Sequence, residues 1–181
     1  MSLRMRAVVF LAAALLPANA PATTYTVRPD GTGDFPTIQA AIDAAVHGDV
    51  IELTNGTFRG PGNRDIDYRG KAITVRSQSG SPEACVIDCE GRPSEPHRGF
   101  HFDGDGEGGV LDGVTVTNGY RSDGGAVWIM MSSPAIRHCI FRQNQASGSG
   151  GGVYCDMLSG ATFFQCTFDG NVARAGGGFC I

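Results

Sequence analysis

Two stretches of the sequence decide the fold, because one is a near-copy of the other: CIFRQNQASGSGGGVYC at Cys139–Cys155 and CTFDGNVARAGGGFC at Cys166–Cys180. A weaker third copy, VTVTNG at Val114–Gly119, precedes them. The starts of the three copies are 25 and 27 residues apart. A period of this length is typical of a solenoid, in which each repeat forms one coil that stacks on the next.

The copies have the pattern of short strands joined by sharp turns. Apolar residues alternate at the start of each copy, which places them on one face of a strand. These pairs are Val114/Val116, Cys139/Phe141 and Cys166/Phe168. The sixth position is Gly119, Asn144 or Asn171, and both residue types tolerate a left-handed backbone. We therefore predict a left-handed turn at these three positions, with their side chains stacked as a hydrogen-bonded ladder.

Paired glycines mark a second bend in each unit. The pairs are Gly124-Gly125, Gly151-Gly152 and Gly177-Gly178. An apolar run follows each pair, and no unit contains the pattern of an amphipathic helix. Each coil therefore contains about three short strands, and like positions stack about 4.8 Å apart. The repeat predicts an all-β chain folded as a parallel β-helix (solenoid) of about six coils, roughly 30 Å long at this spacing.

The region before the repeats predicts a lid for this solenoid. Pro36 suits a first helical turn, and Gly48 is a suitable stop. Between them, the apolar residues that fall on one helical face are Ile38, Ala41, Ile42 and Ala45. A first coil left open would expose apolar core and an unpaired strand edge. We therefore expect a short capping helix at Pro36–Val46, on the N-terminal side of the first complete coil.

Two family resemblances follow from these motifs. The steps FRQN at Phe141–Asn144 and FDGN at Phe168–Asn171, each followed by Gly-Gly and an apolar residue, resemble the FxxN and GG[AVILY] motifs of chlamydial-type polymorphic outer-membrane proteins. The resemblance covers roughly residues 110–181. Proteins of that family carry such repeats at the cell surface and are thought to act as adhesins. The resemblance therefore implies an outer-membrane or secreted protein with an adhesin-like role.

The other resemblance is at the front of the chain. DGTGDF at Asp30–Phe35, TIQ at Thr37–Gln39, AID at Ala41–Asp43 and GTF at Gly56–Phe58 are similar to the start of pectin methylesterases and many secreted β-helix proteins. This similarity implies the right-handed fold of the pectin lyase-like superfamily. It does not imply an activity, because one fold carries many unrelated functions.

Residues 1–22 have the pattern of a signal peptide. Arg4 and Arg6 precede the apolar run AVVFLAAALL, which is too short to span a bilayer, and small residues allow cleavage after Ala22. The alternative is an uncleaved membrane anchor. No later stretch is apolar enough to cross a membrane. The β-helix domain is then 23–181, and because it ends inside the strand of GGGFCI, we expect further coils and an anchoring or sorting domain downstream.

Charge and missing motifs narrow the function. Cleavage lowers the basic count from 14 to 12 against 18 acidic residues, a net charge of −6, which argues against nucleic-acid binding. Motifs like YQDTL, DFIFG and LGRPW of pectin methylesterases are absent, and no pair of catalytic acids can be named. We expect an exported scaffold that binds an extracellular protein or glycan without catalysis or cofactor. The alternative is the N-terminal part of a polysaccharide-active lyase, hydrolase or esterase.

Two groups of residues resemble metal-binding sites. Asp103, Asp105 and Glu107 alternate as calcium ligands do in some loops, but the rest of an EF-hand is missing. The other reading is an acidic, glycine-rich turn. Cys85 and Cys89, with two histidines after them, suggest zinc. Two cysteines four apart on a strand are about 13 Å apart, too far for one metal, so core thiols are the preferred interpretation.

The remaining cysteines and aromatic residues are assigned from the repeat. Cys139 and Cys166 hold equivalent positions in adjacent coils, about 4.8 Å apart, so they form either a disulfide or a pair of small core residues. Tyr154 is expected to point outward. Trp128, aligned with Cys155, is expected in the core.

Overall fold

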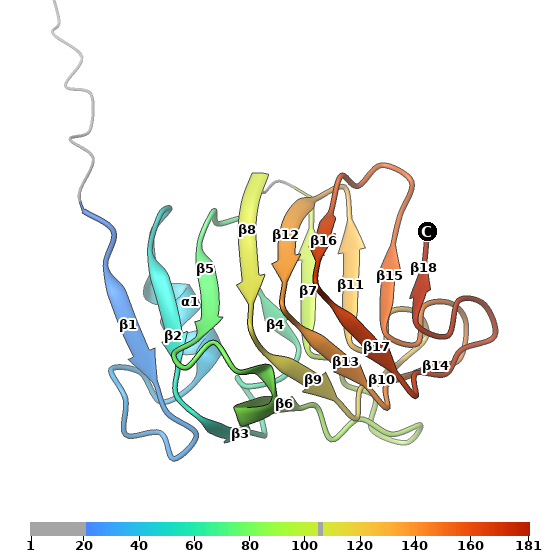
Figure 1. The fold of residues 1–181 in the computed structure, drawn as a ribbon, viewed down its shortest axis with the longest axis horizontal. Coiled ribbons are helices and arrows are strands. Elements are labelled where there is room, and N and C mark those ends of the chain that lie inside the picture. The colour runs from blue at the N-terminus through green and yellow to red at the C-terminus, as the bar shows by residue number, and fades with distance from the viewer. Residues whose placement is uncertain (1–20, 105–106) are drawn as a thin grey trace, which may run out of the picture.

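Three parallel sheets wind around one core in the computed structural model, which describes residues 21–104 and 107–181 (Figure 1). Sheet A contains β1 (Thr24–Val27), β2 (Val50–Leu53), β5 (Thr74–Ser77), β8 (Glu107–Asp112), β12 (Ser133–Arg137) and β16 (Thr162–Phe164). Sheet B contains β3 (Gly56–Phe58), β6 (Cys85–Asp88), β9 (Thr115–Thr117), β13 (Ile140–Arg142) and β17 (Thr167–Asp169). Sheet C contains β4 (Ile66–Asp67), β7 (Phe100–Asp103), β11 (Val127–Met130), β15 (Val153–Cys155) and β18 (Phe179–Cys180).

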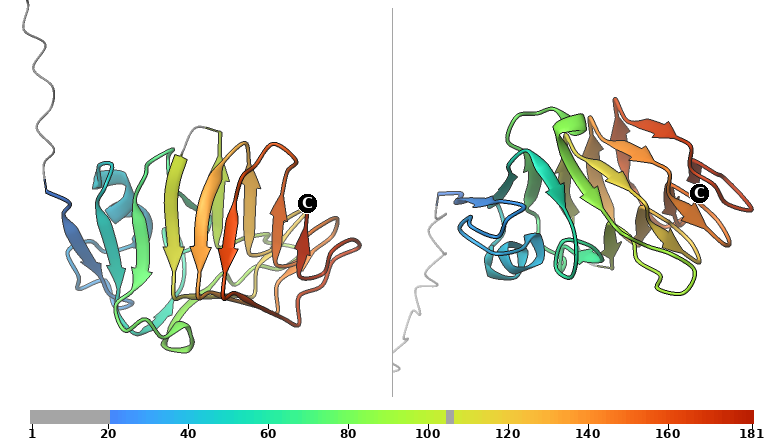
Figure 2. Two further views of the ribbon diagram at one scale, coloured as in Figure 1. Left: turned by 45° about the horizontal axis from the view of Figure 1, so that its top comes forward. Right: turned by 90° about the horizontal axis from the view of Figure 1, so that it is seen from below.

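From β2 onward the chain visits sheets A, B and C in turn, so one strand from each makes a coil. Successive coils stack side by side along the axis, as Figure 2 shows. A small additional sheet pairs β10 (Tyr120–Arg121) with β14 (Gln145–Ala146) at a corner, and a short 3₁₀ helix, η1 (Pro82–Ala84), precedes β6. The predicted all-β, right-handed parallel β-helix is confirmed.

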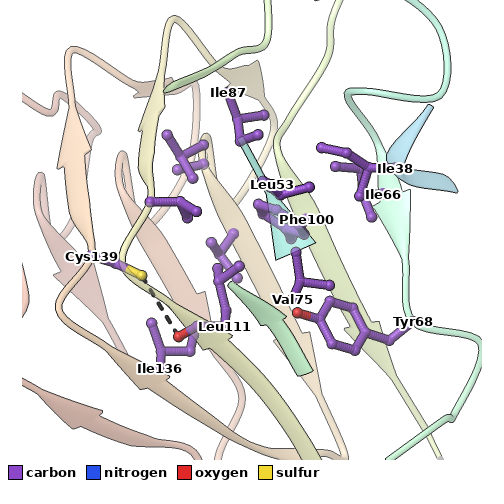
Figure 3. Packing of buried hydrophobic residues seen from close by; sticks show 14 of the residues in the cluster. Ile38, Leu53, Ile66, Tyr68, Val75, Ile87, Phe100, Leu111, Ile136 and Cys139 are labelled. Carbon is purple, nitrogen blue, oxygen red and sulfur yellow. Dashed lines mark hydrogen bonds between the residues drawn. The ribbon is translucent and has the colours of Figure 1, made fainter. Parts of the chain in front are cut away.

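The core is built from alternate residues of the three sheets. Because each coil is in register with the next, inward side chains stack in columns; Ile51, for example, lies opposite Val75. The completely buried columns include Val75, Leu111 and Ile136 of sheet A, Phe58, Ile87, Val116 and Phe141 of sheet B, and Ile66, Phe100, Val127 and Val153 of sheet C. Figure 3 shows part of this core, including the Cys139 thiol, which donates a hydrogen bond to the Leu111 carbonyl.

Helix α1 (Ile38–Ala44) is the predicted cap, although it is shorter than Pro36–Val46. It begins after Thr37 because the Thr37 hydroxyl accepts a hydrogen bond from the Ala40 N–H, which is an N-cap. In the first coil α1 takes the place that β4 takes in the second. The Gln39 amide bonds both to the N–H of Asp67 at 2.8 Å and to its carbonyl at 3.0 Å. The helix therefore covers the free edge of sheet C.

The left-handed turn between sheet B and sheet C lies one position earlier than predicted. Its residues are Asn118, Gln143 and Gly170, with φ of 55°, 56° and 60°. Gly119, Asn144 and Asn171 are not left-handed. The turn places Asn144 inward, where it is completely buried and hydrogen-bonded, so the asparagine serves as a polar residue inside the coil. Its residue type reflects that burial and not the backbone conformation.

The second bend begins at the predicted Gly124 in the first copy, but one residue before the predicted glycine pair in the other two copies. Gly124, Gly150 and Gly176 are its equivalent left-handed residues, with φ of 62°, 64° and 59°. The next position, Gly151, must also be glycine, because a Cβ there would lie 2.4 Å from the Gly177 carbonyl oxygen of the next coil. Equivalent glycines are therefore 26 residues apart, which shifts the alignment of the strands that follow. In the described ranges, no helix has the length and hydropathy needed to cross a membrane.

Candidate functional site

A groove of about 290 Å³ lies on the outer face of sheet C. Its lining residues come from three successive coils of the solenoid: Asp65, Arg98, His101, Asp103, Arg121 and Trp128. The strict alternation of β7 and β11 explains why some of them face outward. Phe100 and Val127 are completely buried, so the next residues, His101 and Trp128, point to the other side of the sheet.

Trp128 therefore lies outside the core, whereas the sequence analysis placed it inside. It is half-buried and lies in register with His101 on one side and Tyr154 on the other. The error came from the phase of the glycine step, which had paired Trp128 with Cys155. Tyr154 is half-buried on the outer face, so the two aromatic side chains stand on neighbouring strands, about 4.8 Å apart along the axis.

Arg98 is the most unusual charge in the groove. Its guanidinium carbon lies 5.6 Å from the centroid of the Trp128 ring, and its Nη1 is buried without a hydrogen-bond partner. Burial, together with the nearby positive charge of Arg121, lowers the pKa of Arg98 to about 10. The group therefore remains a cation at neutral pH, but one that is partly desolvated and forms no ion pair with any described residue.

Asp65 organises the other wall of the groove. Its carboxylate lies 2.5 Å from His97 Nδ1 and accepts hydrogen bonds from Arg121 Nη2 at 2.7 Å and from the Arg98 N–H at 3.1 Å. Burial alone would raise the pKa of Asp65, but these hydrogen bonds outweigh it and hold the pKa below its usual value. Asp65 is thus a fixed anion that positions Arg121.

The acids around the groove are paired to different degrees. Asp67, next along the outer face, forms an ion pair with Arg69 at 2.8 Å and lies 3.5 Å from His101 Nε2. Asp103 is exposed at the rim and has no ion pair with a described residue. The groove thus combines an under-paired cation, an aromatic face and the Asp103 carboxylate, which has no ion-pair partner among the described residues.

A second, larger groove of about 600 Å³ lies on the outer face of sheet A. Its charges pair with each other. Arg76 Nη2 bonds to Glu52 at 2.9 Å, and His138 Nδ1 lies 2.8 Å from the Asp112 carboxylate. These charges already have partners, so this groove offers less unmet charge to a ligand than the groove on sheet C.

The structure describes only part of the predicted calcium site. Asp103 lies at the rim described above, Asp105 is outside the described residues, and the side chain of Glu107 is not described. Cys85 and Cys89 are buried, and burial raises the pKa of the Cys85 thiol to about 12. Within the part of the chain that the structure describes, His, Cys, Asp and Glu side chains form no group of three that could hold a metal.

The asparagine ladder joins three coils. Asn144 Oδ1 accepts a hydrogen bond from the Gly119 N–H at 2.8 Å. Asn144 Nδ2 donates to the Val116 carbonyl and to Asn171 Oδ1, both at 3.0 Å. Asn171 Nδ2 donates in turn to the Phe141 carbonyl at 2.7 Å. The ladder closes the turns between sheets B and C and has no contact with the groove.

Cys139 and Cys166 follow one another in adjacent coils, and all six cysteines of the described residues are free thiols. Cys139 is completely buried, and burial raises its pKa. Interaction with the neighbouring Cys139 side chain is the main cause that lowers the pKa of Cys166 to about 7. Cys139 is therefore a core thiol, whereas Cys166 is a half-buried thiol that is readily ionised.

Sequence reasoning missed the main members of the groove. Arg98 and Asp65 lie at turns outside the repeat, where no period marks their position. Phe100 and Phe102 are both buried, as the alternation in GFHFD at 99–103 would suggest, so this pattern could have identified His101 as an outward residue. Correct phasing of the glycine step would have placed Trp128 beside it.

Comparison with known proteins adds one match. The Chlamydia polymorphic membrane protein (Chlamydia_PMP) repeat matches residues 138–156. That segment contains β13, β14 and β15, with Asn144 of the ladder and Tyr154 of the outer aromatic pair. No curated protein and no solved structure matches the chain. The chain is therefore a parallel β-helix protein that carries a repeat of the polymorphic membrane protein type.

Proposed function

We propose that this protein is exported, displayed at the cell surface and used as an adhesin-like scaffold that binds an extracellular protein or glycan without catalysis of its own. The repeat match at 138–156 is the observation that carries the proposal, because proteins of that repeat family are outer-membrane proteins. The signal-peptide pattern of residues 1–22 supports export; it lies almost wholly outside the described residues.

The fold supports a binding role in physical terms. A parallel β-helix holds its outer side chains on backbones that are hydrogen-bonded on both sides, so little conformational entropy is lost when a ligand binds. On sheet C this rigid surface presents Trp128 and Tyr154 in adjacent register positions. Aromatic side chains of this kind give large contact area at low entropic cost.

The state of the acids supports binding rather than hydrolysis. A carboxyl group that acts as a general acid needs a raised pKa. Among the side chains that the structure describes, the carboxyl groups with a shifted pKa all have it lowered: Asp30, Asp65, Asp88, Glu95 and Asp156. In the groove itself, Asp65 forms an ion pair with Arg121 and lies within hydrogen-bond distance of His97 Nδ1.

Export is tested by expressing the full chain in a Gram-negative host, separating the cell compartments and sequencing the N-terminus of the product. The proposal predicts protein outside the inner membrane that begins at Thr23. Recovery of the chain in the cytoplasm with its leader intact would overturn it. A variant with Arg4→Glu and Arg6→Glu, which removes the charge of the leader, is expected to stay inside.

A further inference from the structure

We propose that Arg98, Arg121 and Trp128 form a binding site for an anionic saccharide. The sugar ring stacks on the exposed part of Trp128, and its carboxylate or sulfate group lies against the two guanidinium groups. This inference rests on the proposed function, because it names the ligand class of the same binding surface. Three features of the groove lead to it: unmet charge, an aromatic face and limited volume.

Arg98 carries the unmet charge, and Arg121 adds a second guanidinium group that is paired with Asp65 through only one nitrogen. Arg98 has no ion pair with a described residue, and its Nη1 is buried without a hydrogen-bond partner. Arg121 uses Nη2 to bond Asp65 at 2.7 Å, while its Nε is buried and also unpartnered. A desolvated cation without an anion is costly, and a bound anion offsets that cost. Guanidinium groups suit carboxylate and sulfate-like oxygens because they present planar, forked donors.

The aromatic face is the reason to expect a sugar ring beside the anionic group of the ligand. Trp128 is half-buried on the outer face, and Tyr154 follows it on the next strand. The C–H face of a sugar ring is apolar and flat enough to pack on such a surface, as any apolar group removed from water would. Arg98 lies over the same ring at 5.6 Å, so a charged substituent on a stacked sugar is brought directly to it.

Volume and overall charge exclude the larger polyanions. The groove of about 290 Å³ is near the lower limit for small-molecule pockets, about 300 Å³. The whole chain carries a net charge of −4, so it repels a long polyanion outside this groove. The free carboxylate of Asp103 at the rim adds to that repulsion. Recognition is therefore local, of one charged ring, and not of an extended nucleic acid.

Isothermal titration of the purified full chain tests the proposal. The probes are a sulfated oligosaccharide without carboxylates (dextran sulfate), a carboxylated one (oligogalacturonate), neutral dextran, and polyphosphate as an anion without a ring. We expect binding of one or both charged saccharides and none of dextran or polyphosphate. The sulfated and carboxylated arms show which anion the site takes.

Variants assign the binding to the groove. Arg98→Gln and Trp128→Ala are each expected to weaken binding about tenfold, which corresponds to about 1.4 kcal/mol. Arg137→Gln is the matched control, because Arg137 is exposed on sheet A and its loss changes the net charge equally. Asp103→Asn is expected to strengthen binding about twofold to threefold, since it removes a like charge from the rim. Circular dichroism of each variant confirms that it is folded.

Several outcomes would overturn the proposal. Equal weakening by Arg137→Gln and Arg98→Gln would show that only net charge matters. Binding of polyphosphate with the same affinity would remove the role of the ring. If the chain binds immobilised extracellular-matrix proteins but no saccharide, this inference fails while the proposed function stands. If it binds neither, both fail.

Discussion

The asparagine ladder gives the sharpest test of the turn geometry. Asn144→Ala removes a completely buried side chain that makes three hydrogen bonds across three coils. The Gly119 N–H loses its acceptor, and an unsatisfied buried donor costs about 1–3 kcal/mol. Losing the two bonds that Asn144 Nδ2 donates adds about 1 kcal/mol. We therefore expect a loss of about 3 kcal/mol in the free energy of unfolding, a large part of the 5–15 kcal/mol of a typical domain.

The neighbouring residue is the matched control. Gln143 is exposed and left-handed, with φ of 56°. Gln143→Gly should be nearly neutral, because glycine adopts this conformation freely but gains entropy in the unfolded chain. Gln143→Val should cost about 1–2 kcal/mol, since a β-branched residue resists positive φ. At Asn144, by contrast, glycine should be as harmful as alanine, because the backbone there is not left-handed.

Urea unfolding followed by circular dichroism measures these differences, with thermal melting as a second readout. A loss of about 3 kcal/mol in a domain of this size lowers Tm by roughly 6–12 °C. The reasoning is refuted if Asn144→Ala costs less than about 1 kcal/mol. It is also refuted if Asn144→Gly is mild while Gln143→Gly is harmful, because that pattern would return the left-handed residue to position 144.

Three further predictions follow from the site and the thiols. The pKa of Cys166 is lowered to about 7, so its alkylation by iodoacetamide should rise steeply through about pH 7 while buried Cys139 stays protected; equal labelling of both thiols would contradict the geometry. The pKa of Asp65 is lower in the folded chain, so its contribution to stability is present above about pH 4 and is lost as pH falls through the folded pKa. The difference in unfolding free energy between wild type and Asp65→Asn should therefore narrow in acid. A difference that stays constant with pH would argue against the ion pairs. The purified chain should release no product from polygalacturonate or methylated pectin, with or without calcium; turnover that Asp65→Asn abolishes would show that the groove is catalytic.

The fold could be predicted because its determinants repeat. Period and alternation fix the parallel coils, and the amphipathic pattern from Ile38 to Ala45 fixes the cap. The phase of the turns could not be fixed to one residue, because asparagine is favoured both by a left-handed backbone and by a buried polar position. Asn144 occupies a buried polar position and is not left-handed.

The site was harder to predict for a different reason. Trp128 and Tyr154 carry a sequence signal, which is the outward position of an alternating strand, but using it requires the correct phase. Arg98 and Asp65 carry none, since they come together only when turns 33 residues apart in sequence stack in space. Charge pairing across coils depends on register between units that are not copies of each other.

Native mass spectrometry of the purified chain, incubated with neutral, carboxylated and sulfated oligosaccharides together, shows whether the groove selects an anionic sugar and leaves it intact. We expect a complex whose added mass is that of one intact anionic oligosaccharide, with the neutral ones left free. No complex at all, neutral sugars bound as readily as charged ones, or only shortened oligosaccharides after incubation would contradict a non-catalytic site that selects an anionic sugar.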